Sequence, residues 1–123
     1  LFGKCQTVRL YHSDTHSVSG SFELERAVVR WFLSIKNSHL PVRDGEKQLS
    51  TFRSLSVDGK EIEFSDGFTD LHTRVYQDIL GGAGLGIEES RPSIELAHTI
   101  RHAKTVDVDE MAHPLWIRIK ETL

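Results

Sequence analysis

Two side chains with hydrogen-bonding and proton chemistry stand four residues apart in the middle of the sequence, His72 and Tyr76. On a helix this spacing places both side chains on one face. An imidazole beside a phenol can donate hydrogen bonds to a polar ligand and accept hydrogen bonds from it. The alternative is structural: His72 satisfies a backbone carbonyl at the start of the helix, and Tyr76 packs in the core with its hydroxyl in water.

The helix expected to carry this pair follows a predicted strand. Its apolar residues recur three or four positions apart, which indicates helical periodicity: Phe68, Leu71, Val75 and Ile79. Thr69 is the expected N-cap, and Asp70 would then lie in the first turn, where a carboxylate suits the positive end of the helix dipole. Gly81 and Gly82 are expected to end the helix in a left-handed conformation.

Ahead of this helix, short runs of alternating apolar and polar residues predict β-strands. We expect strands at residues 6–11, 19–24, 27–35, 49–57 and 60–64. The run at 27–35 is the most apolar, so we expect it to be the central strand of an antiparallel sheet. Glu25–Arg26 and Asp58–Gly59 supply turns, the second of them a strong hairpin signal because both residues tolerate positive φ. Residues 36–48 are expected to form a surface excursion.

Two further helical segments are expected after residue 86. Ser90 is the expected cap of the first, with Pro92 in its first turn, where a missing N–H costs nothing. In the tail, Pro114 is expected to break a helix that begins near Asp109 and to restart it, with an apolar side that must dock. The whole pattern predicts an α+β domain: about five mostly antiparallel strands followed by two or three helices packed on one face.

A second histidine pair, His98 and His102, has the spacing of the zinc motif His-Glu-x-x-His. The catalytic glutamate of that motif is replaced by Thr99, and Arg101 stands beside the pair and disfavours a cation. We therefore interpret these histidines as a solvent-facing or interface pair and predict no metal site.

The glycine-rich run at 82–86 ends a helix instead of opening one after a strand, and the acidic pair Glu88–Glu89 follows it. Both features argue against a dinucleotide-binding loop, so a flexible link is expected. The sequence also has no Gly-x-Ser-x-Gly elbow and no carboxylate pair in an apolar setting. We accordingly predict no catalytic and no cofactor-binding residue within this chain.

Composition limits the partners. A chain of 123 residues supports one domain, and a net charge of −3 argues against a nucleic-acid partner. The single cysteine, Cys5, excludes an internal disulfide and fits a reducing compartment, so we expect a cytoplasmic location. No apolar run approaches the roughly 20 residues of a membrane helix, so no membrane partner is expected.

The opening Leu1-Phe2-Gly3 has the pattern of the last turn and cap of a helix, which predicts a piece of a longer polypeptide; a trimmed N-terminus is the alternative.

Several blocks of the sequence resemble the C-terminal domain of the Gfo/Idh/MocA oxidoreductase family. The order of the strands, the glycine-rich helix end and the run Ser-Arg-Pro-Ser-x-Glu-Leu-x-His-x-Ile-Arg-His at 90–102 carry this resemblance. The blocks at 29–35, 56–65 and 67–73 are similar to the branch that oxidises UDP-N-acetylglucosaminuronic acid at C3 in lipopolysaccharide (O-antigen) sugar synthesis. The similarity extends to about Ala103.

The resemblance implies a two-part enzyme that uses NAD or NADP, held in an N-terminal Rossmann domain outside this chain. The catalytic lysine of the family lies in a Glu-Lys-Pro motif, whereas Glu46-Lys47 here is followed by Gln48, so that role does not carry over. The catalytic histidine of the family would precede Leu1. Residues 1–123 are then expected to be a single C-terminal domain that lines the substrate pocket, forms a homo-oligomer through the open face of its sheet, and binds no NAD alone.

The expected substrate, a UDP-uronic acid, offers a carboxylate, a diphosphate and hydroxyls, which arginine forks and neutral hydrogen-bonding groups recognise. We predict His72 and Tyr76 as contacts to sugar or phosphate, and Arg53 and Arg30 as contacts to anionic groups. Each arginine has the alternative of being an exposed strand residue. The alternative function is a stand-alone, non-catalytic α+β module that dimerises through its open sheet face. A glycine-rich βαβ unit upstream of Leu1 would favour the dehydrogenase.

Overall fold

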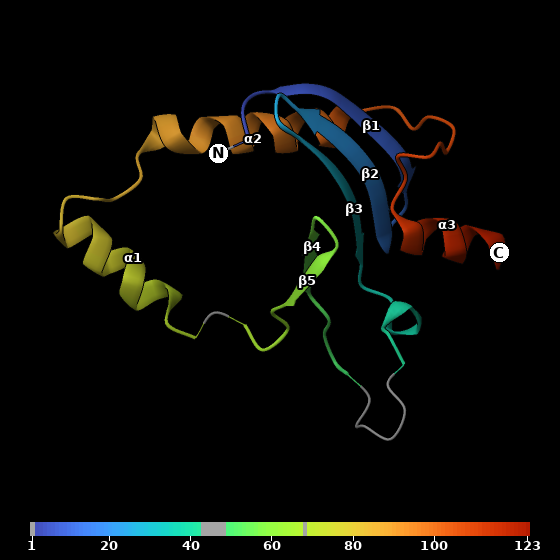
Figure 1. The fold of residues 1–123 in the computed structure, drawn as a ribbon, viewed down its shortest axis with the longest axis horizontal. Coiled ribbons are helices and arrows are strands. Elements are labelled where there is room, and N and C mark those ends of the chain that lie inside the picture. The colour runs from blue at the N-terminus through green and yellow to red at the C-terminus, as the bar shows by residue number, and fades with distance from the viewer. Residues whose placement is uncertain (1, 43–48, 68) are drawn as a thin grey trace. The chain divides into compact units, whose positions relative to one another are not determined.

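The computed structural model describes residues 2–42, 49–67 and 69–123 (Figure 1). In chain order its elements are β1 (Cys5–Ser13), β2 (Ser17–Leu24), β3 (Ala27–Ser34), the 3-10 helix η1 (Asn37–His39), β4 (Ser54–Val57), β5 (Lys60–Glu63), α1 (Leu71–Leu80), α2 (Ile87–His102) and α3 (Pro114–Glu121). The predicted α+β class is confirmed. The chain divides into two compact units, one formed by residues 1–35 with 87–123 and the other by residues 36–86.

The sheet of the first unit has the order β1-β2-β3 and is antiparallel throughout, so β2 lies between its neighbours (Figure 1). The prediction that 27–35 is the central strand is therefore wrong. Apolar content does not identify the central strand of this sheet, because the central strand β2 carries small residues. Ser19 and Ser21 are the most buried side chains of β2. Val28 and Leu33 of β3 remain 55% and 67% exposed. The predicted Glu25–Arg26 turn does join β2 to β3.

An irregularity in β1 shapes the surface on which the tail docks. The pairing of β1 with β2 shifts register between Leu10 and His12, as at a β-bulge. A bulge turns consecutive side chains away from strict alternation, and both Leu10 and Tyr11 are buried. The carbonyl of Leu10 also accepts a hydrogen bond from the N–H of Val106 (2.8 Å), which ties the chain after α2 to the edge of the sheet.

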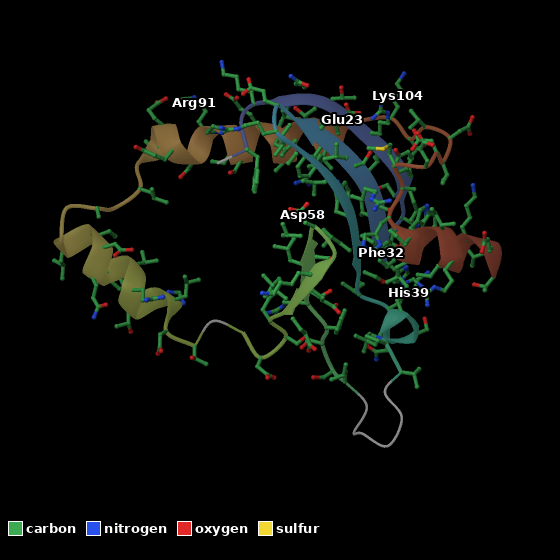
Figure 2. All side chains as sticks on the ribbon, in the orientation of Figure 1. Glu23, Phe32, His39, Asp58, Arg91 and Lys104 are labelled. Carbon is green, nitrogen blue, oxygen red and sulfur yellow. The ribbon has the colours of Figure 1, made fainter. Side chains whose placement is uncertain are left out.

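The tail packs on this sheet through a small apolar core. Tyr11, Ala112 and Trp116 are buried together, and further apolar residues pack against them: Phe32, Val108, Met111, Ile117 and Ile119. Phe32 extends from β3 toward α3 (Figure 2). Pro114 occupies the first turn of α3, so the predicted helix start at this proline is confirmed. Residues 109–113 form no helix, so the expected helix from Asp109 that Pro114 would break is absent there.

Helix α2 begins at Ile87, three residues before the predicted cap Ser90, and Pro92 lies inside it instead of in the first turn. This prediction was wrong because Glu88 and Glu89 themselves occupy the first turn, where the positive end of the helix dipole favours carboxylates. The cost is one backbone hydrogen bond, which Pro92 cannot donate.

In the unit of residues 36–86, β4 and β5 form an antiparallel hairpin. Its tip is the predicted Asp58–Gly59 turn, with φ of +49° and +80°, and Asp58 stands at the end of the hairpin in Figure 2. The expected strand at 49–57 is shorter than predicted, since regular pairing is confined to Ser54–Val57. Residues 43–48 of the expected excursion, including Glu46-Lys47-Gln48, lie outside the described residues.

Helix α1 ends as its two glycines predict. Gly82 has a φ of +79°, its N–H donates to the carbonyl of Ile79 (3.1 Å), and the N–H of Ala83 donates to that of Asp78 (2.8 Å). These two bonds form a Schellman cap. At the other end the N-cap position is Asp70, not the predicted Thr69, and its side chain makes no capping bond. Phe68, predicted to begin the apolar stripe, lies outside the described residues.

Candidate functional site

The predicted contacts His72 and Tyr76 both lie on α1, one turn apart, so the structure places them on one side of one helix. Both are exposed, Tyr76 by 67%. The structural alternatives, a carbonyl partner for His72 and core packing for Tyr76, are not realised within the described residues, where α1 buries no side chain. The two rings are therefore free to contact a ligand.

Arg53 belongs to the same unit, just before β4. Its backbone is fixed by two hydrogen bonds: the Arg53 N–H donates to the Ser65 hydroxyl (2.9 Å), and the Phe64 N–H donates to the Arg53 carbonyl (2.9 Å). The backbone of Arg53 is thus tied to the residues that directly follow β5, while the side chain is exposed. A fixed backbone with a free guanidinium suits recognition of an anionic group.

Arg30 lies in the other unit, on β3 opposite Ser21 of β2. Its charge acts on the imidazole of His113: burial chiefly lowers the pKa of His113, and the positive charge of Arg30 lowers it further. Arg30 lies two residues before Phe32 on β3 and so on the same face of the sheet, the face on which the tail docks. The sequence did not indicate this environment.

Sequence reasoning missed a polar cluster beneath the tail. The hydroxyl of Tyr11 donates to the Asp109 carboxylate (2.5 Å) and lies 3.0 Å from the hydroxyl of Ser21. Arg9 pairs with Glu23 and lies 3.8 Å from Asp109 through its Nε. Burial and the bond to Asp109 raise the pKa of Tyr11, and the same bond is the main cause that lowers the pKa of Asp109. No spacing signal predicts this cluster, since Tyr11 and Asp109 are 98 residues apart.

Next to this cluster, a row of stacked aromatic rings lies along α3. The rings of His12 and Trp116 stack with centroids 4.1 Å apart at 20°, and Phe32 stands 6.1 Å from Trp116 and 6.4 Å from His113. The Nδ1 of His113 accepts a hydrogen bond from the backbone N–H of Leu115 (3.2 Å) and so caps α3. These contacts hold the tail on the sheet.

The second histidine pair is exposed on α2. The rings of His98 and His102 have centroids 4.1 Å apart, and the Nδ1–H of His102 donates to the carbonyl of His98 (2.8 Å). Within residues 2–42, 49–67 and 69–123, no three or more His, Cys, Asp or Glu side chains gather as a metal would require. The same part of the chain contains no helix that is long and apolar enough to cross a membrane.

Comparison with family models gives no match. Two solved structures of the WlbA (WbpB) dehydrogenase from Thermus thermophilus are similar to this chain. The first, in complex with NAD and α-ketoglutarate, is 43% identical over 93% of this chain, with a TM-score of 0.83. The second, in complex with NAD and UDP-GlcNAcA, is 40% identical over 92% of this chain, with a TM-score of 0.82.

The chain spans only 37% and 36% of the length of those two proteins. The matched region nevertheless includes both described units, since it covers more than nine-tenths of the residues here. This chain is therefore similar, in sequence and in backbone fold, to the C-terminal part of the WlbA (WbpB) dehydrogenase, which confirms the resemblance predicted from residues 29–35, 56–65, 67–73 and 90–102.

Proposed function

We propose that this chain is the substrate-binding and oligomerisation part of an NAD(P)-dependent nucleotide-sugar dehydrogenase. The reaction is the oxidation of a UDP-N-acetyl-hexosaminuronic acid at C3 in lipopolysaccharide biosynthesis. One observation carries the proposal: over more than nine-tenths of its length the chain is at least 40% identical to a dehydrogenase crystallised with NAD and, in one case, with UDP-GlcNAcA. Because the chain covers little more than a third of that protein, the cofactor site is assigned to the remaining part.

Oxidation of a C3 hydroxyl removes a hydride from carbon and a proton from oxygen, and NAD or NADP, when bound, takes up the hydride. The residues of this chain contribute positioning. The rings of His72 and Tyr76 hydrogen-bond hydroxyl or phosphate oxygens, and the guanidinium of Arg53 pairs with the carboxylate or the diphosphate. Arg30 is the fourth proposed contact, and its proximity to His113 makes it the one with a competing structural role.

The oligomer contact is assigned to the face of the β1-β2-β3 sheet that the tail does not cover. Phe32 contacts the tail, so Leu33, its neighbour on β3, points to the opposite face. Leu33 pairs with Val18 across β2 and β3 and is mostly exposed. Trp31 lies on the same face two residues earlier. Val18 and Trp31 are half-buried, so the three residues form a partly exposed apolar group, which favours contact with another protein surface.

The assignment of His72 is tested in the full-length protein with the variant His72→Ala and the matched control Gln77→Ala, which changes another exposed residue of α1. Loss of one hydrogen bond to a charged ligand group is expected to raise the KM for the nucleotide sugar about tenfold. The KM for NAD should not change in His72→Ala. In the control Gln77→Ala, neither the KM for the nucleotide sugar nor the KM for NAD should change. An unaltered sugar KM in His72→Ala would remove this residue from the site.

Two further measurements test where the cofactor binds and which surface forms the oligomer. Calorimetry of the 123-residue chain with NAD is expected to show no binding at micromolar concentration, and micromolar binding would refute the assignment of the cofactor to another part. Sedimentation of the full-length Leu33→Glu variant should show a smaller oligomer, because a buried unpaired carboxylate in an apolar contact is costly. An unchanged oligomer would assign the contact to another surface.

A further inference from the structure

Trp116 is the central aromatic contact between α3 and the sheet. Trp116 is 5% exposed and is the buried residue of the helix. It packs on Tyr11 and Ala112 and is flanked by the rings of His12 and Phe32. A helix of eight residues has little stability of its own in water, so its shape and its docking reinforce each other.

The cap of this helix is a titratable group. The Nδ1 of His113 accepts a hydrogen bond from the Leu115 N–H, which requires a lone pair on Nδ1 and therefore the neutral ring with its proton on Nε2. An imidazolium has no lone pair and cannot form this bond. It would also place a positive charge at the positive end of the helix dipole.

The surroundings of His113 disfavour its charged form in two more ways. The ring is half-buried against Phe32, with centroids 6.4 Å apart, and Arg30 of β3 adds a positive charge on the same side. Burial first, and the charge of Arg30 second, lower the pKa of His113. Docking of α3 and protonation of this ring therefore oppose each other.

Two other charged groups lie near the docked helix. On β1, the Nε2 of His12 lies 3.0 Å from the Ser17 hydroxyl and 3.2 Å from the Asp14 carboxylate, while its ring stacks on Trp116. Before α3, the bond from Tyr11 lowers the pKa of Asp109, so this carboxylate stays ionised while imidazoles titrate.

We propose that protonation of His113 releases α3 from the sheet, which makes the docking of Pro114–Glu121 a pH-sensitive contact controlled by one imidazole. The ring is neutral in the docked state, so docking has its full strength above the ordinary histidine pKa and weakens as the pH falls through the lowered pKa of His113. Each unit by which docking lowers this pKa corresponds to a roughly tenfold change in the docking equilibrium. The inference does not depend on the proposed function.

The test compares the wild-type chain with His113→Asn, since an asparagine side chain caps a helix without titrating. Backbone amide spectra of α3 and of β2 are recorded from pH 7.5 to pH 5.0, with His113→Ser as a second non-titrating cap. In the wild type we expect the ratio of released to docked α3 to rise as the pH falls, while the β2 signals persist. Both variants should stay docked throughout, and His12→Gln should retain the wild-type response.

Three results would overturn the proposal. One is a wild-type α3 that stays docked at pH 5.0. Another is a pH response in His113→Asn equal to that of the wild type, which would assign the titration to a different group. The third is simultaneous loss of the β2 and α3 signals, which would show that the acid transition is global unfolding.

Discussion

Replacement of Gly20 by alanine is the sharpest test of the packing described above. Gly20 lies in the middle of β2, opposite Trp31 of β3 and Leu10 of β1. A Cβ at this position would stand 2.5 Å from the carbonyl oxygen of Arg9 and 2.5 Å from Cζ2 of Trp31, with Cε2 of the same ring at 2.9 Å. Neither contact is tolerable without movement, and the carbonyl belongs to the backbone of β1, where no side-chain rotation relieves it.

The magnitude follows from two opposing effects. Forcing an extra methyl group into a packed site costs about 1–3 kcal/mol, and a fixed backbone oxygen favours the upper end of this range. Alanine is better than glycine in a regular strand by about 0.5–1 kcal/mol. We therefore expect Gly20→Ala to lower the free energy of unfolding by about 2 kcal/mol, which lowers Tm by roughly 8 °C for a chain of this size.

Urea unfolding followed by circular dichroism measures this change, and a second variant identifies its source. In a Trp31→Leu background the ring contact is absent while the contact with the Arg9 carbonyl remains, so Gly20→Ala should cost about 1 kcal/mol less there than in the wild type. The reasoning fails if Gly20→Ala is within about 0.5 kcal/mol of the wild type, or if the two substitutions are strictly additive.

Three other perturbations have defined outcomes. Asp58→Asn should leave the hairpin intact and Asp58→Val should weaken its pairing in amide spectra, because Asp58 has positive φ and a β-branched residue is strained there. Tyr11→Phe removes the donor that most lowers the pKa of Asp109, so carboxyl-carbon NMR should show this group titrating at higher pH, and the stability that it contributes should be lost at correspondingly higher pH as acid is added. Ala112→Leu should lower the thermal midpoint, because Ala112 is fully buried in the core and a larger side chain there forces its neighbours to move.

Local chemistry explains which features the sequence predicted. Asp58–Gly59 specifies its turn because both residues accept positive φ, and the structure has this turn. Pro114 starts a helix because its ring fits the first turn and its missing N–H is not needed there. The glycines after α1 specify a left-handed cap for the same kind of reason. In each case the determining residues are neighbours in the sequence.

The features that the sequence did not predict depend on residues far apart in the chain. β2 is central although β3 is more apolar, because strand order is set by which side chains the tail and the neighbouring strands cover. The bond between Tyr11 and Asp109 joins the first strand to the segment before the last helix. The half-burial of His113 likewise results from docking on β3. Periodicity and spacing carry no information on such pairings.

The candidate site lies in the part of the chain that has the least internal support. Helix α1 has ten residues and buries none of them within the described structure, although an isolated helix of this length is marginal in water. The β4–β5 hairpin has two strands, which alone are also marginal. The apolar side of α1, with Leu71 and Val75, therefore needs contacts beyond those described to hold the helix in place. Because His72 and Tyr76 stand on the same short helix, any surface that covers its apolar side also fixes these two rings. Under the proposed function, substrate contacts and contacts with a covering surface would therefore be coupled through α1.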